Sequence, residues 1–183
     1  MKRIVALSFF IFRFINGVSQ GGDSTKCWDA HNKLAWDDFK SKIDISSMFA
    51  ASFRSEIIVY PFSQNDSTYE YRVKAVFYKY EAWTKSANEY ILKHEQLHFD
   101  IIELFARKLR KRIKEFSGDM DSKFGTVVKG LIAESLKWEK DYDRDTNHGA
   151  FIEDQQKWVK KISAELDSLK GYASTPKDCN SRD

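Results

Sequence analysis

The sequence predicts an α+β domain in which a small antiparallel β-hairpin or sheet precedes three helices, the first carrying a metal-binding motif. Alternating apolar and polar residues occupy much of residues 52–80, and apolar repeats of helical period fill most of the chain after them. Only two prolines interrupt the 183 residues, and no internal repeat divides them. Since domains commonly contain about 100–200 residues, we expect residues 21–183 to form one domain.

Residues 1–20 have the layout of a secretory signal peptide. Lys2 and Arg3 precede an apolar run over residues 4–18, and small or polar residues follow it. Arg13 interrupts the run, so its uninterrupted part is too short to span a bilayer. We expect cleavage near residue 20, a secreted or periplasmic protein, and no integral membrane span after cleavage. An uncleaved N-terminal anchor is the alternative.

The hairpin is predicted from two segments joined by turn-forming residues. Residues 52–60 end in an apolar run, and residues 63–67 read Ser-Gln-Asn-Asp-Ser, which is typical of a turn. Residues 68–80 alternate, with one predicted face made of Tyr69, Tyr71, Val73, Ala75 and Phe77 and the other of Glu70, Arg72 and Lys74.

A long helix is predicted next, over residues 86–116, where apolar residues recur and no proline or glycine occurs before Gly118. Ser86 and Glu89 have the spacing of a capping box. Two further helices are predicted over about 123–142 and 151–169. Their apolar stripes are most simply core: Phe124, Val127, Val128, Leu131, Ile132 and Trp138 in one, and Trp158, Val159, Ile162, Leu166 and Leu169 in the other.

The first helix contains His-Glu-Gln-Leu-His at residues 94–98, the H-E-x-x-H pattern of zinc hydrolases. On a helix, His94 and His98 project from one face about one turn apart, where both can reach one Zn²⁺ ion. Glu95 is offset around the helix, where it can act as general base without being a ligand. The alternative is a solvated helix face on which these three residues have no joint role.

A catalytic zinc site usually has three protein ligands, so a third must come from elsewhere. We expect His148 first, because it lies in a loop and Gly149 lets the backbone turn inward. Asp143 at the end of the second helix is the main alternative. Glu134 and Glu139 on that helix would give a glutamate ligand instead.

Charge gives no general reason to expect a nucleic acid partner. The chain has 30 Lys+Arg and 27 Asp+Glu, and removing the signal with its three basic residues leaves 27 of each sign. A basic cluster remains in the long helix, where we expect a solvated helix end: Arg107, Lys108, Arg110, Lys111, Arg112 and Lys114. Cys27 and Cys179, near the two ends of the mature chain, can pair in an oxidising compartment.

Three segments together resemble a bacterial family, domain of unknown function 922, predicted to contain secreted zinc-dependent proteases. They are Leu-Ala-Trp-Asp-Asp-Phe at 34–39, Lys-His-Glu-Gln-Leu-His-Phe-Asp at 93–100, and Tyr142-Asp143 followed by Thr146, His148 and Gly149. The resemblance implies a zincin-like fold, with an antiparallel sheet beside the metal-binding helix, and an exported location. Within the second segment, Asp100 is placed to orient a ligand through its other ring nitrogen.

The expected function is therefore an exported zinc-dependent metallopeptidase acting on a peptide or protein. Glu95 would serve as general base and then general acid, and Tyr142 is the candidate donor to the oxyanion. Two alternatives use the same features: a zinc hydrolase of another amide bond, such as one in the cell wall, and a non-catalytic exported binding domain.

Overall fold

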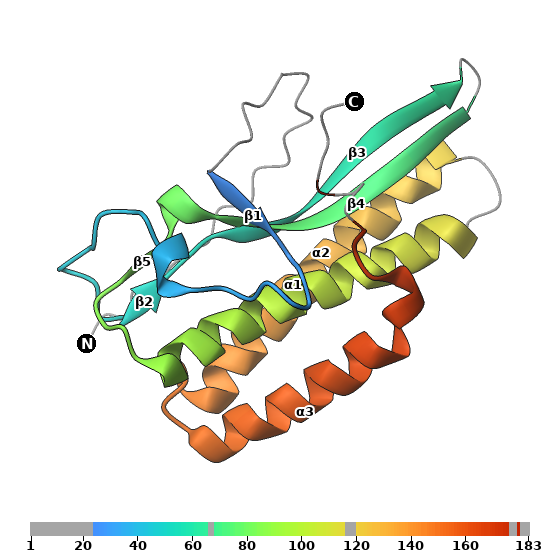
Figure 1. Cartoon of the computed structure of the whole chain (residues 1–183). Helices are drawn as coiled ribbons and strands as arrows, with labels where there is room; N and C mark the ends of the chain where they lie inside the picture. The colour runs from blue at the N-terminus through green and yellow to red at the C-terminus, as the bar shows by residue number, and fades with distance from the viewer. Residues whose placement is uncertain (1–23, 66–67, 116–119, 176–178, 180–183) are drawn as a thin grey trace.

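The computed structural model describes residues 24–65, 68–115, 120–175 and 179, so the predicted signal peptide lies outside the described residues. These residues form an α+β fold, with small antiparallel sheets followed by three helices (Figure 1). The strands are β1 (Thr25–Cys27), β2 (Ala51–Ser52), β3 (Ser55–Asn65), β4 (Thr68–Tyr78) and β5 (Trp83–Thr84). The helices are α1 (Glu89–Glu115), α2 (Met120–Thr146) and α3 (Ile152–Ser168).

The predicted hairpin is confirmed as β3 and β4, which pair antiparallel with Val59 opposite Val73. The expected alternation holds where β4 meets the core, because Val73, Ala75 and Phe77 are each at most 1% exposed. Strand β1, which the sequence did not predict, adds to the other edge of β4 to complete the order β1-β4-β3. Strands β2 and β5 form a separate two-stranded sheet.

Helix α1 lies between the three-stranded sheet and the other two helices (Figure 1). Its residues Phe99, Ile102 and Ala106 pack in the cluster that includes the buried face of β4. Ile101 and Phe105 belong to a second cluster that includes residues of α2 and α3. Because α1 is buried on two sides, apolar residues occupy most of its circumference over this stretch.

The bounds of α1 and α2 differ from the prediction. Helix α1 begins at Glu89, and Asn88 caps it, since its Oδ1 accepts a hydrogen bond from the backbone N–H of Tyr90 at 2.7 Å. The predicted capping box is wrong, because Ser86 lies before the cap residue Asn88, and its backbone N–H and carbonyl both bond the hydroxyl of Thr84. Helix α2 runs from Met120 to Thr146, four residues beyond its predicted end near residue 142. Val159, placed on the apolar stripe of α3, is 40% exposed.

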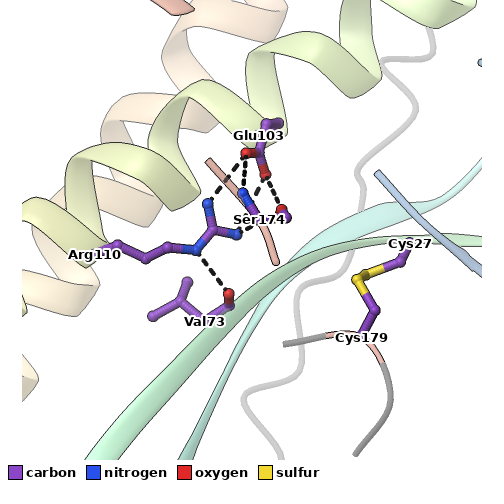
Figure 2. Close-up of a disulfide and its surroundings, with 6 residues drawn as sticks. All are labelled: Cys27, Val73, Glu103, Arg110, Ser174 and Cys179. Atoms are coloured by element: carbon purple, nitrogen blue, oxygen red, sulfur yellow. Dashed lines mark hydrogen bonds and ion pairs between the residues drawn. A yellow bond between two sulfur atoms is a disulfide. The ribbon is translucent and has the colours of Figure 1, made fainter. Parts of the chain in front are cut away.

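The expectation of a solvated basic helix end is wrong for Arg107 and Arg110. Both pair with Glu103, which is fully buried, at 2.9 and 3.1 Å. Figure 2 shows the guanidinium of Arg110 also reaching the carbonyl of Val73 on β4 and Ser174 in the C-terminal segment. This ion network joins α1 to the sheet and to the end of the chain.

The predicted disulfide is confirmed. Cys27 and Cys179 are joined across a sequence separation of 152 residues, with their Cα atoms 5.9 Å apart (Figure 2). Since Cys27 ends β1 and Cys179 lies near the end of the chain, the bond ties the two ends of the domain together. None of the helices in the described part of the chain is long and apolar enough to cross a membrane.

Candidate metal centre

The two motif histidines lie on the buried face of α1, where His94 is 5% and His98 is 7% exposed. Their rings stand 4.9 Å apart, nearly perpendicular to each other. Each ring directs its Nε2 atom at Oδ1 of Asp143, at 3.3 Å from His94 and 3.0 Å from His98. A helical spacing of four residues thus brings both imidazoles to one point, as the motif predicts.

Asp143 reaches this point because α2 packs along α1 and extends one turn further than the sequence indicated. The donor atoms of His94, His98 and Asp143 all lie within 4.8 Å of one another, and together they could hold a metal ion. Ligands about 2.0–2.1 Å from one tetrahedral zinc ion lie about 3.3 Å apart. The observed contacts of 3.0 and 3.3 Å fit that spacing.

The other three candidates for the third ligand lie outside this group. His148, the first choice from sequence, has its Nδ1 3.5 Å from Oδ1 of Asp143, and its side chain is 54% exposed. Glu139 faces His98 from the opposite side, with its Oε1 3.7 Å from Nδ1. Glu134 is about half exposed and pairs with Lys108 at 3.9 Å.

The electrostatics of the group favour a bound cation. Burial opposes a charge on His98, but hydrogen bonds and charges of Asp143 and Glu139 outweigh burial and raise its pKa to about 10. Burial lowers the pKa of His94 despite its contact with Asp143. Burial alone would raise the pKa of Asp143, yet its hydrogen bonds with the two imidazoles hold that pKa well below its usual range. A proton or a metal ion can supply the positive charge that these groups select.

Glu95 lies beside the group without belonging to it, as expected for a residue one position along the helix from His94. Its side chain is buried, at 7% exposure. Burial raises the pKa of Glu95 to about 7, with the charge of Asp143 adding to the rise and His98 opposing it. A carboxyl group whose pKa is near neutrality can both accept and return a proton.

Tyr142 forms the floor under the two imidazoles. Its ring stacks on His94 at 4.7 Å and meets the edge of His98 at 4.8 Å. The residue is fully buried, and its hydroxyl has no hydrogen-bond partner among the described residues. Burial, followed by the charges of Glu95 and Asp143, raises its pKa. Tyr142 therefore packs against the rings of both motif histidines.

The turn after α2 is strained. Asn147 and His148 have φ of 47° and 55°, in the left-handed region that side chains rarely adopt, and Gly149 has φ of 82°. A Cβ on Gly149 would lie 3.1 Å from both Cγ and Nδ1 of His94. The glycine therefore serves two needs, a left-handed backbone and a close approach to the first motif histidine. The ring of His148 contacts Phe49 at 5.1 Å between centroids.

The expectation that Asp100 orients a ligand is wrong. Its Oδ1 accepts hydrogen bonds from Trp28 Nε1 at 2.6 Å and from Gln96 Nε2 at 2.8 Å. Gln96 in turn accepts a bond from the backbone N–H of Leu34 at 2.8 Å. These residues fasten the N-terminal segment to α1.

Sequence reasoning missed Gln155, whose Oε1 lies 3.1 Å from Nδ1 of His94. A signal for it existed. Gln155 precedes Trp158 and Ile162 by three and seven residues, so it continues the apolar stripe of α3 although it is polar. A glutamine at a core position of a helix needs a hydrogen-bond partner, and here that partner is the first motif histidine.

Residues 63–149 match a family described as "Bacterial protein of unknown function (DUF922)". The match spans the end of β3, all of β4 and α1, and α2 with the turn after it, so it includes His94, His98 and Asp143. The chain is similar to this family over those residues, which agrees with the resemblance noted in the motifs. No significant match to a curated protein or to a solved structure was found. The family has no assigned function, so an activity must be argued from the site.

Proposed function

We propose that the protein is an exported zinc-dependent metallopeptidase in which His94, His98 and Asp143 hold the metal. The observation that carries the proposal is the convergence of two imidazole nitrogens and one carboxylate oxygen within 4.8 Å, next to a buried glutamate. Nitrogen and oxygen donors of this kind suit Zn²⁺, and three protein ligands leave a position open, whereas structural zinc sites have four.

A bound zinc ion would bring the pKa of water toward neutrality and polarise the carbonyl of the substrate. Glu95 then accepts the proton of the attacking water and passes it to the leaving amine. The buried position of Glu95 supports this role, since burial brings its pKa to about 7.

A donor is also needed for the oxyanion that forms when the carbonyl is attacked. Tyr142 was the candidate from sequence, but its side chain is fully buried beneath the imidazoles. His148 lies at the edge of the same group and is 54% exposed, so its imidazole can meet a substrate directly. The proposal therefore assigns this donor role to His148 and the support of the ligands to Tyr142.

Export is proposed on two features. The N-terminal segment has the layout of a signal peptide, and the Cys27–Cys179 disulfide is consistent with an extracytoplasmic location, where such bonds persist. The substrate would then be a peptide or protein met outside the cytoplasm.

The test compares the mature protein with His94→Ala and Glu95→Gln. We expect one zinc ion in the wild type, none in His94→Ala, and unchanged zinc content and thermal stability in Glu95→Gln. Cleavage of a broad peptide mixture at neutral pH should fall about 10²–10⁴-fold in Glu95→Gln. A wild type that stays metal-free with added zinc would refute the metal site. Equal cleavage by wild type and Glu95→Gln would refute the role of Glu95, and zinc binding without cleavage would favour a binding domain.

A further inference from the structure

Gln155 is a buried polar side chain on the otherwise apolar buried face of α3. It is 3% exposed, and it belongs to the same helix face as Trp158 and Ile162, which pack in the core. Burying an amide without a hydrogen bond costs free energy, so a glutamine at this position needs a reason. Its Oε1 lies 3.1 Å from Nδ1 of His94, a residue 61 positions earlier in the chain.

The direction of this hydrogen bond determines which ring nitrogen of His94 is free. An amide oxygen only accepts, so Nδ1 of His94 must carry the hydrogen and donate it. The lone pair that a metal ion needs is then on Nε2. The carboxylate of Asp143 lies 3.3 Å from Nε2 and favours a hydrogen on that nitrogen when no metal is bound, so Gln155 favours the metal-binding tautomer and Asp143 opposes it. A nitrogen must be free of its proton to bind a metal, and the hydrogen bond made by the other nitrogen fixes this.

Two further contacts restrict the ring without choosing between its nitrogens. Gly149 approaches so closely that a Cβ there would lie 3.1 Å from the imidazole, and Tyr142 stacks on the ring at 4.7 Å. Both are contacts of shape rather than of donor and acceptor. Gln155 is the neighbour in contact with Nδ1 whose chemistry distinguishes one tautomer from the other.

We propose that Gln155 is a positioning residue that holds His94 in the tautomer and orientation required for metal binding. The inference rests on the proposed metal site and assigns α3 a part in it. Helix α1 supplies two ligands, α2 the third, and α3 the contact that prepares the first. Glu139 faces Nδ1 of His98 in the corresponding way, at a longer 3.7 Å.

The first experiment measures the zinc affinity of the full mature chain by competition with a chelator. Gln155→Leu removes the acceptor and should lower the affinity about 10–100-fold, the usual effect of losing a residue that orients a ligand. Gln155→Glu keeps an acceptor oxygen and should restore affinity to within a few-fold of wild type. Gln96→Leu is the matched control, because Gln96 lies on the motif helix but contacts Asp100 and Leu34. It should bind zinc as the wild type does.

Wild-type affinity in Gln155→Leu would overturn the proposal. Equal losses in Gln155→Leu and Gln155→Glu would also overturn it, since the effect would then come from packing rather than from the hydrogen bond.

The second experiment uses metal-free protein, so that it decides the point even if the proposed enzyme binds no zinc. It is carried out in an Asp143→Ala background, which removes the carboxylate that favours a hydrogen on Nε2 of His94. Nitrogen-15 chemical shifts of the His94 ring report which nitrogen carries the hydrogen. The Asp143→Ala protein should show it on Nδ1. Adding Gln155→Leu should abolish this preference, and adding Gln96→Leu should keep it. The same tautomer with and without Gln155→Leu would refute the role of Gln155, whatever the outcome for zinc or for peptide cleavage.

Discussion

Loss of the Cys27–Cys179 disulfide should lower the free energy of unfolding without altering the folded structure. The bond closes a loop of 152 residues, for which the chain-entropy relation gives about 5 kcal/mol. For a domain of this size that corresponds to a fall in Tm of about 10–20 °C. The folded C-terminal segment should stay in place, because Arg110 also binds the carbonyl of Tyr172 and the hydroxyl of Ser174, each at 2.9 Å.

Urea unfolding followed by tryptophan fluorescence measures this effect in three samples: oxidised wild type, reduced wild type, and Cys27→Ser/Cys179→Ser. The last two should agree with each other, and the serine variant should not respond to reductant. The dependence of the unfolding free energy on urea should steepen without the bond, since the unfolded chain then exposes more surface. Equal unfolding free energies for oxidised and reduced wild type would refute the reasoning.

Five other substitutions test separate parts of the fold, and chemical denaturation measures the change in unfolding free energy for each. Glu103→Gln leaves the guanidinium groups of Arg107 and Arg110 without their carboxylate and should lower the unfolding free energy by about 3–5 kcal/mol. Lys137→Ala breaks an exposed ion pair on α2 and should lower it by at most about 0.5 kcal/mol. Gly149→Ala, at φ of 82°, should destabilise by about 1–2 kcal/mol and weaken zinc binding. Gly130→Ala, inside α2 with open space around it, should stabilise by about 0.5–1 kcal/mol. Burial opposes ionisation of Asp38, but hydrogen bonds from Lys26 and a backbone N–H lower its pKa. The ionised carboxylate therefore stabilises the fold, and Asp38→Asn should lower the unfolding free energy by its full amount above about pH 4. This loss should shrink and vanish as the pH falls further and Asp38 becomes protonated. An Asp38→Asn cost that did not change with pH would contradict this.

The parts of the fold predicted well from sequence are those whose pattern and contacts are local. Alternation along β4 predicted which side chains face the core, because neighbouring residues on a strand point to opposite faces. The spacing of His94 and His98 predicted their convergence for the same kind of reason, since one turn of a helix is a fixed geometry. Strand β1 has three residues and no alternation to read, so its pairing with β4 had no local signal.

The third donor was harder to predict because it depends on where α2 ends and on how α2 packs against α1. The sequence placed the end of the helix near residue 142, with Asp143 at that end and His148 in the loop after it, and the loop histidine was preferred. The structure continues α2 to Thr146, whose side-chain hydroxyl donates to the carbonyl of Tyr142 at 2.7 Å. That extra turn puts Asp143 on the helix face toward the two imidazoles.

The basic cluster was misinterpreted because charge alone does not reveal burial. Arg107 and Arg110 follow Glu103 by four and seven residues, so all three project from neighbouring positions on one helix face. That spacing allowed an internal network, but a solvated helix end has the same composition. What distinguishes the two is the set of acceptors brought by other elements, such as the carbonyls of Val73 and Leu166.

The candidate site and the ion network lie on different parts of the same helix, α1. The motif histidines lie in the first part of α1, and Glu103 follows His98 by five residues, so both groups sit on one rigid element buried between the sheet and two helices. The ion network and the disulfide anchor the far part of the domain. At the beginning of α1, the packing of α2 and α3 against this helix brings together the donor atoms of His94, His98 and Asp143. Each of the three helices contributes a contact to the candidate metal group. A bound ion would therefore stabilise the folded state by mass action. For the same reason, a change that displaces any of the three helices should lower the metal affinity.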